Sequence, residues 1–191
     1  MATKDHQSEP IESASETLQR IFDGHGSVLG SQMADESLRY DVLKKTDFPK
    51  PQRTRRIAVA NQKGGVGKTT STVNTAAALA NKGAQVLVID MDPQGNASTA
   101  LGVSHASGEP SVYDVIEGRS DLGDVITVCP DFPTLDVVPA SIDLSGAELE
   151  VADLPNRNTL LKEALDLYLR QSDKHYDYVF IDCPPSLGLL V

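Results

Sequence analysis

The distribution of apolar residues separates the first 52 residues from the rest of the chain. This stretch is polar, carries three glycines between positions 24 and 30, and ends in Pro49-Lys50-Pro51. Apolar residues recur at helical spacing between positions 11 and 22 and again between positions 38 and 43, which predicts two short helices. We expect residues 1–52 to form a flexible polar arm whose helices are transient or induced by a partner. Residues 53–191 are predicted to form one domain.

From residue 56 onward, short apolar runs alternate with longer helical segments. Ile57–Ala60 is an apolar run, and Thr69–Asn81 continues without a helix breaker and has a face of small apolar side chains. Gln85–Asp90 is almost continuously apolar up to its final aspartate, which is typical of a strand buried on both faces. This order of elements predicts a β-α-β unit with a right-handed crossover.

The second half of the chain repeats the alternation. Thr134–Ala140 is predicted to be a third strand, Asn158–Gln171 a helix and Tyr176–Asp182 a fourth strand, which Pro184-Pro185 ends. Alternating strands and helices favour a layered α/β fold with a mainly parallel sheet flanked by helices.

The connection between the first strand and the first helix carries the strongest chemical signal. Its sequence is K-G-G-V-G-K-T-T, and glycines let backbone N–H groups point into a concave turn that binds phosphate. Lys68 adds a full positive charge at the helix N-terminus, and the Thr69 hydroxyl is placed to bind Mg²⁺. A dinucleotide fingerprint is excluded because Thr70 occupies its third glycine position. The predicted nucleotide-binding residues are Lys63, Gly64, Gly65, Val66, Gly67, Lys68, Thr69 and Thr70.

Carboxylates follow two of the predicted strands. Asp90 and Asp92 lie in the sequence D-M-D-P-Q-G-N, and Asp182 ends the fourth strand. Open parallel sheets build their sites at the carboxyl ends of their strands. Nucleotide hydrolysis needs carboxylates beside the magnesium ion and the attacking water. The alternative for all three is that Asp simply favours the turn at a strand end.

The phosphate loop also departs from the ordinary Walker A pattern, because Gln62 stands where that pattern has glycine and a second lysine, Lys63, opens the loop. In this respect it resembles the deviant Walker A box of the ParA/MinD ATPases. The D-M-D-P-Q-G-N sequence resembles the partition ATPases in particular, as do residues 98–102 and 145–149. The chain is therefore identified as similar to the ParA-family partitioning ATPases of chromosomes and plasmids, over residues 56–191.

This resemblance implies a P-loop NTPase fold, ATP and Mg²⁺ as cofactors, and roles for individual residues. The implied catalytic residues are Lys63, which reaches the partner subunit's nucleotide in an ATP-dependent homodimer, Lys68, and Asp92, which orients the attacking water. Thr69, Asp92 and Asp182 are implied to form the magnesium site, with Asp182 as the Walker B aspartate, binding directly or through water. Asp90 is expected to support this site from behind or to cap its strand.

The resemblance further implies a ParB-like partner that stimulates hydrolysis, and non-specific DNA binding that places the ATP-bound protein on the nucleoid. The net charge of −10 argues against a surface that binds nucleic acid throughout. The arginines at positions 53, 55 and 56 are expected to be a solvated edge. Family members continue beyond the Walker B strand with the base-binding loop and the basic DNA surface, so we expect the chain to be truncated there, with an incomplete C-terminal half.

Other features favour a cytoplasmic protein without membrane contact. The sequence has no run of 18 apolar residues and its first ten residues lack the apolar region of a signal peptide. Cys129 and Cys183 have neither metal-binding nor disulfide spacing and are expected to pack in the core. Three alternatives remain open: a MinD-like membrane-positioning ATPase, a nucleotide-binding adaptor that positions another cargo, and a fragment without a competent site.

Overall fold

The computed structural model describes residues 28–150 and 156–185. The chain divides into two units, residues 1–48 and 49–191. In the first unit, helix α2 (Val28–Lys45) contains the predicted helical positions 38–43 and is longer than expected. The helix predicted between positions 11 and 22 lies outside the described residues. The flexible-arm character of residues 1–52 stays a prediction.

The second unit is built on a five-stranded sheet in the order β1-β5-β2-β4-β3. Its four main strands are parallel, as predicted from the alternating pattern. The sequence predicted only these four, and the count was wrong because β3 is a two-residue strand that pairs antiparallel at the sheet edge. The strands are β1 (Arg55–Val59), β2 (Val86–Asp90), β3 (Thr127–Val128), β4 (Leu135–Val138) and β5 (Tyr178–Asp182).

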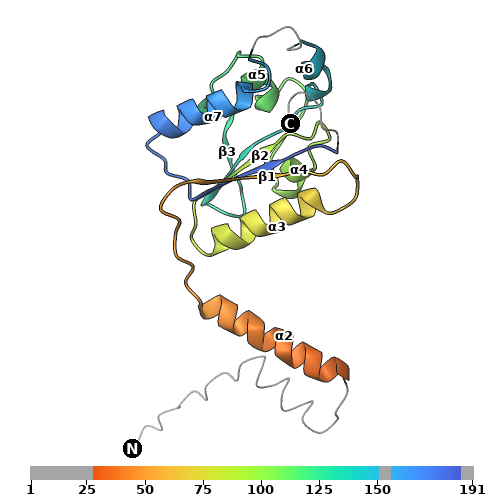
Figure 1. Cartoon of the computed structure of the whole chain (residues 1–191), viewed down its shortest axis with the longest axis vertical. Helices are drawn as coiled ribbons and strands as arrows, with labels where there is room; N and C mark the ends of the chain where they lie inside the picture. Colours follow the sequence, from red (N-terminus) through yellow and green to blue (C-terminus); the bar gives the residue numbers. More distant parts are fainter. Residues whose placement is uncertain (1–27, 151–155, 186–191) are drawn as a thin grey trace, which may run out of the picture. The chain divides into compact units, whose positions relative to one another are not determined.

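Helices cover both faces of this sheet. Helix α3 packs on one face together with the short helix α4, and α5, α6 and α7 lie over the other face (Figure 1). The 3-10 helix η1 joins the second group through its buried leucine and valine. The helices are α3 (Lys68–Asn81), α4 (Asn96–Ala100), α5 (Val112–Ile116), η1 (Leu122–Val125), α6 (Leu144–Glu150) and α7 (Leu160–Gln171).

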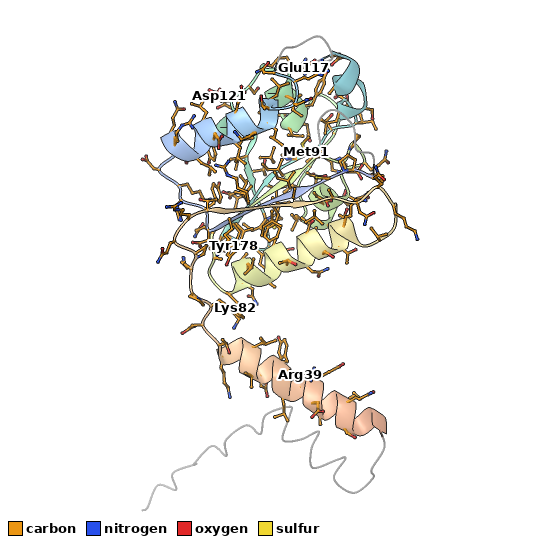
Figure 2. All side chains as sticks on the ribbon, viewed as in Figure 1. Arg39, Lys82, Met91, Glu117, Asp121 and Tyr178 are labelled. Carbon is orange, nitrogen blue, oxygen red and sulfur yellow. The ribbon has the colours of Figure 1, made fainter. Side chains whose placement is uncertain are left out.

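Strand β2 is buried along its whole length and divides the core in two. Leu87 and Ile89 pack with α5 and α7, whereas Val86 and Val88 pack with the small residues of α3, because successive strand side chains point to opposite faces. Figure 2 shows the same division, with Met91 on the α7 side of the sheet and Tyr178 of β5 on the α3 side. The continuous apolar run of the sequence is therefore a strand buried on both faces.

The register of the strands brings the chemical motifs to one edge of the sheet. Asp182 at the end of β5 pairs with Val59 of β1 on one side and with Asp90 of β2 on the other. Val59 ends β1 two residues before Asn61, and the phosphate loop follows. Cys129 and Cys183 are buried free cysteines, as expected for packing. In the described part of the chain, no helix is long and apolar enough to cross a membrane.

Candidate functional site

The glycine-rich connection between β1 and α3 forms a loop that wraps onto the start of the helix. Gly65 and Gly67 have φ angles of 71° and 87°, which side chains with a Cβ rarely adopt. Gly67 is the N-cap of α3, and its carbonyl accepts the N–H of Ser71 at 2.8 Å. The N–H groups of the first turn of α3 therefore face the loop, as an anion-binding site at a helix N-terminus requires.

A pocket of about 410 Å³ opens over this loop. Most of the predicted nucleotide-binding residues line it, and Asp92 reaches it from the loop after β2. The sequence did not predict Asn96 or Pro185 as site residues, although Asn96 ends the D-M-D-P-Q-G-N sequence and Pro185 belongs to the proline pair after the fourth predicted strand. The lining residues are Gly64, Gly65, Gly67, Lys68, Thr69, Thr70, Asp92, Asn96 and Pro185.

The two lysines of the loop occupy different positions. Lys68 is half-buried, lines the pocket, and directs its Nζ to within 3.5 Å of the carbonyl of Lys63. The side chain of Lys63 is exposed and does not line the pocket, while its backbone N–H donates to Asn61 Oδ1 at 2.9 Å. Val66 is also outside the lining and 45% exposed at the tip of the loop. Lys68 is thus available to a ligand in its own pocket, and Lys63 to a ligand outside it.

Asp182 lies buried beneath the loop and is bound to α3. Its carboxylate accepts hydrogen bonds from Thr69 Oγ1 at 2.7 Å and from Thr72 Oγ1 at 3.2 Å. Burial raises the pKa of Asp182, the two hydroxyls oppose this, and the charge of Asp92 adds to it. Thr72 was not predicted, although it follows Thr69 by three residues and so lies on the same helix face.

The two aspartates after β2 have different environments. Asp92 is half-buried, and its Oδ1 accepts the N–H of Gln94 at 3.0 Å, which closes a local turn. Asp90 is fully buried and accepts hydrogen bonds from Ser98 N, Ser98 Oγ and Asp92 N. Burial raises the pKa of Asp90, and these hydrogen bonds oppose the shift. Asp90 therefore supports the loop from behind, and Asp92 lines the pocket.

These residues fit a nucleoside triphosphate with magnesium. The loop supplies backbone N–H groups and Lys68 for the phosphates, and the Thr69 hydroxyl stands beside Asp182. No cluster of three or more His, Cys, Asp or Glu that could hold a metal occurs among the described residues. The Thr69–Asp182 pair suits Mg²⁺, because this ion is usually held by one or two carboxylates with phosphate oxygens and waters.

A second cavity, of about 330 Å³, lies on the α7 side of the sheet. Its lining is mostly apolar and includes Met91, Ile116, Leu165 and Ile181. The phosphate loop does not contribute to it, so it does not compete as a nucleotide site.

Residues 54–191 match a family model described as AAA domain. The sporulation initiation inhibitor protein Soj of Bacillus subtilis is 49% identical over 134 residues, which are 70% of this chain and 51% of that protein. The chromosome partitioning protein ParA of Caulobacter vibrioides is 47% identical over 136 residues, 71% of this chain and 50% of that protein. The chain thus spans about half the length of the curated relatives it matches.

Solved structures agree with the fold. Cobyrinic acid a,c-diamide synthase from Mycobacterium smegmatis, solved with an ATP analogue and magnesium, is 41% identical with a TM-score of 0.64 and covers 72% of this chain and 54% of that chain. A plasmid partition protein from Borrelia burgdorferi is 28% identical with a TM-score of 0.62, covering 72% of this chain and 58% of that chain. The mainly parallel sheet flanked by helices is the fold that this chain shares with both of these solved structures.

Proposed function

The chain belongs to the AAA-domain family, among its ParA- and Soj-type partitioning members, and we propose a function on this basis. The proposed function is that of the ATP-binding part of a DNA-segregation switch. In this proposal it binds Mg-ATP in the 410 Å³ pocket, hydrolyses it to ADP and phosphate, and changes its association state with the nucleotide. The observation that supports the proposal best is the convergence of Lys68, Asp92 and the Thr69–Asp182 pair at one edge of the sheet.

Each residue has a separate task in the proposed hydrolysis. The N–H groups of Gly64–Thr70 and the ammonium of Lys68 bind the phosphates and stabilise the charge that develops in the transition state. Thr69 contributes its hydroxyl oxygen to the magnesium site, and Asp182 holds that hydroxyl in place. Asp92 orients the attacking water from the pocket wall. Bound magnesium supplies charge neutralisation of the phosphate oxygens.

Lys63 is assigned to a second subunit. It is exposed and stands outside the lining of its own pocket, which suits a side chain that reaches the nucleotide of a facing copy. ATP would then hold two copies together, because each subunit completes the other's phosphate site. The proposed partners are a second copy of the chain, a ParB-like protein and non-specific DNA. The proposed location is the cytoplasm, with the ATP-bound form associated with the nucleoid.

The experiment that tests this proposal measures molecular mass by light scattering with and without Mg-ATP, for the chain and for Lys63→Gln. The proposal expects a dimer that requires ATP and is lost in the variant. Hydrolysis is followed in parallel, with and without DNA and a ParB-like protein. ATP binding without turnover under all of these conditions would favour a nucleotide-binding adaptor, and ATP-dependent binding to lipid vesicles would favour a MinD-like membrane-positioning ATPase. A monomer under every condition would overturn the switch for this chain.

A further inference from the structure

A buried chain of hydrogen bonds runs from Ala140, two residues after the end of β4, to the loop that carries Asp92. The N–H of Ala140 donates to Ser98 Oγ at 3.1 Å, and the Ser98 hydroxyl donates to Asp90 Oδ2 at 2.8 Å. The other oxygen of Asp90 accepts the N–H of Asp92 at 3.1 Å. Asp90, Ser98 and Ala140 are all 0% exposed, so water does not compete for these bonds.

The carboxylate of Asp90 holds both ends of one loop. Its Oδ1 binds the N–H of Asp92, where the loop leaves β2, and its Oδ2 binds the N–H of Ser98 at 2.8 Å, inside α4. A carboxylate that only capped a strand would need only the first of these bonds. Because both ends are bound to one rigid group, residues 92–97 form a closed turn fixed to the end of β2.

The orientation of the Ser98 hydroxyl is fixed by two hydrogen bonds. It has one proton, which it gives to Asp90, and it accepts from the N–H of Ala140. The position of α4 is thereby coupled to the end of β4 as well as to β2. Buried networks in which every member is satisfied restrict motion more than isolated bonds do.

We propose that Asp90 and Ser98 are positioning residues that set the place of Asp92 over the phosphate loop. The inference rests on the proposed function, in which Asp92 orients the attacking water. Asp90 and Ser98 do not line the pocket themselves and act through the backbone of the loop. Because misplacing a catalytic group by about 1 Å can cost 100-fold in rate, a loosened loop lowers turnover without removing the phosphate-binding groups.

The test compares Ser98→Ala, Asp90→Asn and Ser98→Thr, which keeps the hydroxyl, with Ser145→Ala at an exposed position of α6 as the control. We expect kcat to fall about 10- to 100-fold in the first two, with KM and the affinity for a non-hydrolysable ATP analogue within about threefold, and partial recovery in Ser98→Thr. Adding Asp92→Ala should make the Ser98→Ala change silent, since both act through one group. Equal losses of affinity and kcat, or an additive double variant, would overturn the inference.

A second measurement does not depend on turnover or on the folding of any variant. Hydrogen exchange of the unsubstituted chain is followed with and without Mg²⁺ and the non-hydrolysable analogue. The inference expects exchange at the amide of Ala140 to slow together with the amides of residues 91–98 other than Pro93, and unchanged exchange at Ala140 contradicts it. Full turnover in Asp92→Ala would remove the catalytic assignment in the proposed function. An inactive Asp92→Ala beside a fully active Ser98→Ala would overturn the positioning inference alone.

Discussion

The hydroxyl of Thr69 donates a 2.7 Å hydrogen bond to Asp182 Oδ2, although the two residues are 113 positions apart in the chain. This bond fixes the first turn of α3 to the carboxyl end of β5. A hydroxyl that gives its proton to a carboxylate keeps its lone pairs for a cation. The arrangement would suit Thr69 as a residue that holds magnesium and Asp182 as the group that orients its hydroxyl.

Thr69→Val tests this division of roles, because valine keeps the shape of threonine and removes the hydroxyl. Nucleotide binding without magnesium should change little, since Lys68 and the backbone N–H groups remain. The factor by which Mg²⁺ increases the affinity for the nucleotide should fall by about 10- to 100-fold. Titration calorimetry with and without Mg²⁺ measures both quantities. Thr75→Val, at an exposed position of the same helix, is the control, and equal magnesium dependence in both variants would refute the assignment.

Lys68→Ala should remove nucleotide binding. A hydrogen bond from a charged group contributes about 1.5–3 kcal/mol, and each 1.4 kcal/mol is about tenfold, so losing contacts to two phosphates weakens binding by roughly 100-fold or more. The matched control is Lys82→Ala at the other end of α3, about 20 Å away along the helix. A fluorescent ATP analogue gives both affinities, and similar values would show that Lys68 does not contact the phosphates.

Asp92→Ala should bind ATP and fail to hydrolyse it. Its carboxylate lines the pocket but forms no part of the glycine-rich loop, so phosphate affinity should remain. Loss of a group that positions or deprotonates water lowers rates by about 10²- to 10⁴-fold. Single-turnover phosphate release measures the effect, with the exposed Asp131→Ala as control. The ATP-dependent dimer should persist longer in Asp92→Ala, and a variant that turns over normally contradicts the assignment.

The elements that the sequence predicted well are those with a long, regular pattern. Helix α3 and strand β2 begin and end within one residue of the predicted ranges, because an unbroken helix and a doubly buried strand leave clear periodicities. The five-residue helices α4 and α5 were missed because they are too short for a period to repeat. For α5 a local signal existed: Ser111 and Asp114 form a capping box, which the spacing S-x-x-D indicates.

Most residues that line the candidate pocket could be predicted from the sequence, but Lys63 and Val66 lie outside the lining, Asn96 and Pro185 were missed, and the contacts between residues were not predictable. Glycine spacing and strand ends identify Lys68, Asp92 and Asp182 without any knowledge of their neighbours. The bond from Thr72 to Asp182 joins residues 110 positions apart and depends on strand register. The sequence likewise could not predict Ser98 as a partner of Asp90, because only the folding of residues 92–97 brings Ser98 back to the end of β2.

Asp177 should be important for stability rather than for chemistry. Its carboxylate is 3% exposed, accepts the N–H of Gln85 at 2.8 Å at the start of β2, and lies 3.6 Å from Lys50 Nζ. Asp177→Ala leaves the N–H of Gln85 without this acceptor, and an unsatisfied group of this kind costs about 1–3 kcal/mol. Urea denaturation should show this loss, and the exposed Asp173→Ala should leave the free energy of unfolding within about 0.5 kcal/mol.

Gly95→Ala should destabilise the turn that carries Asp92, for two separable reasons. Gly95 has a φ of 62°, where an alanine costs about 1–2 kcal/mol. An added Cβ would also lie 2.4 Å from Nδ1 of His105, whose Nε2 is 2.8 Å from Thr99 Oγ1. Thermal denaturation of Gly95→Ala, His105→Ala and the double variant separates the two effects. The double variant should recover the part due to the clash and retain the part due to φ. A single Gly95→Ala that melts with the unsubstituted chain would show that this turn tolerates a side chain.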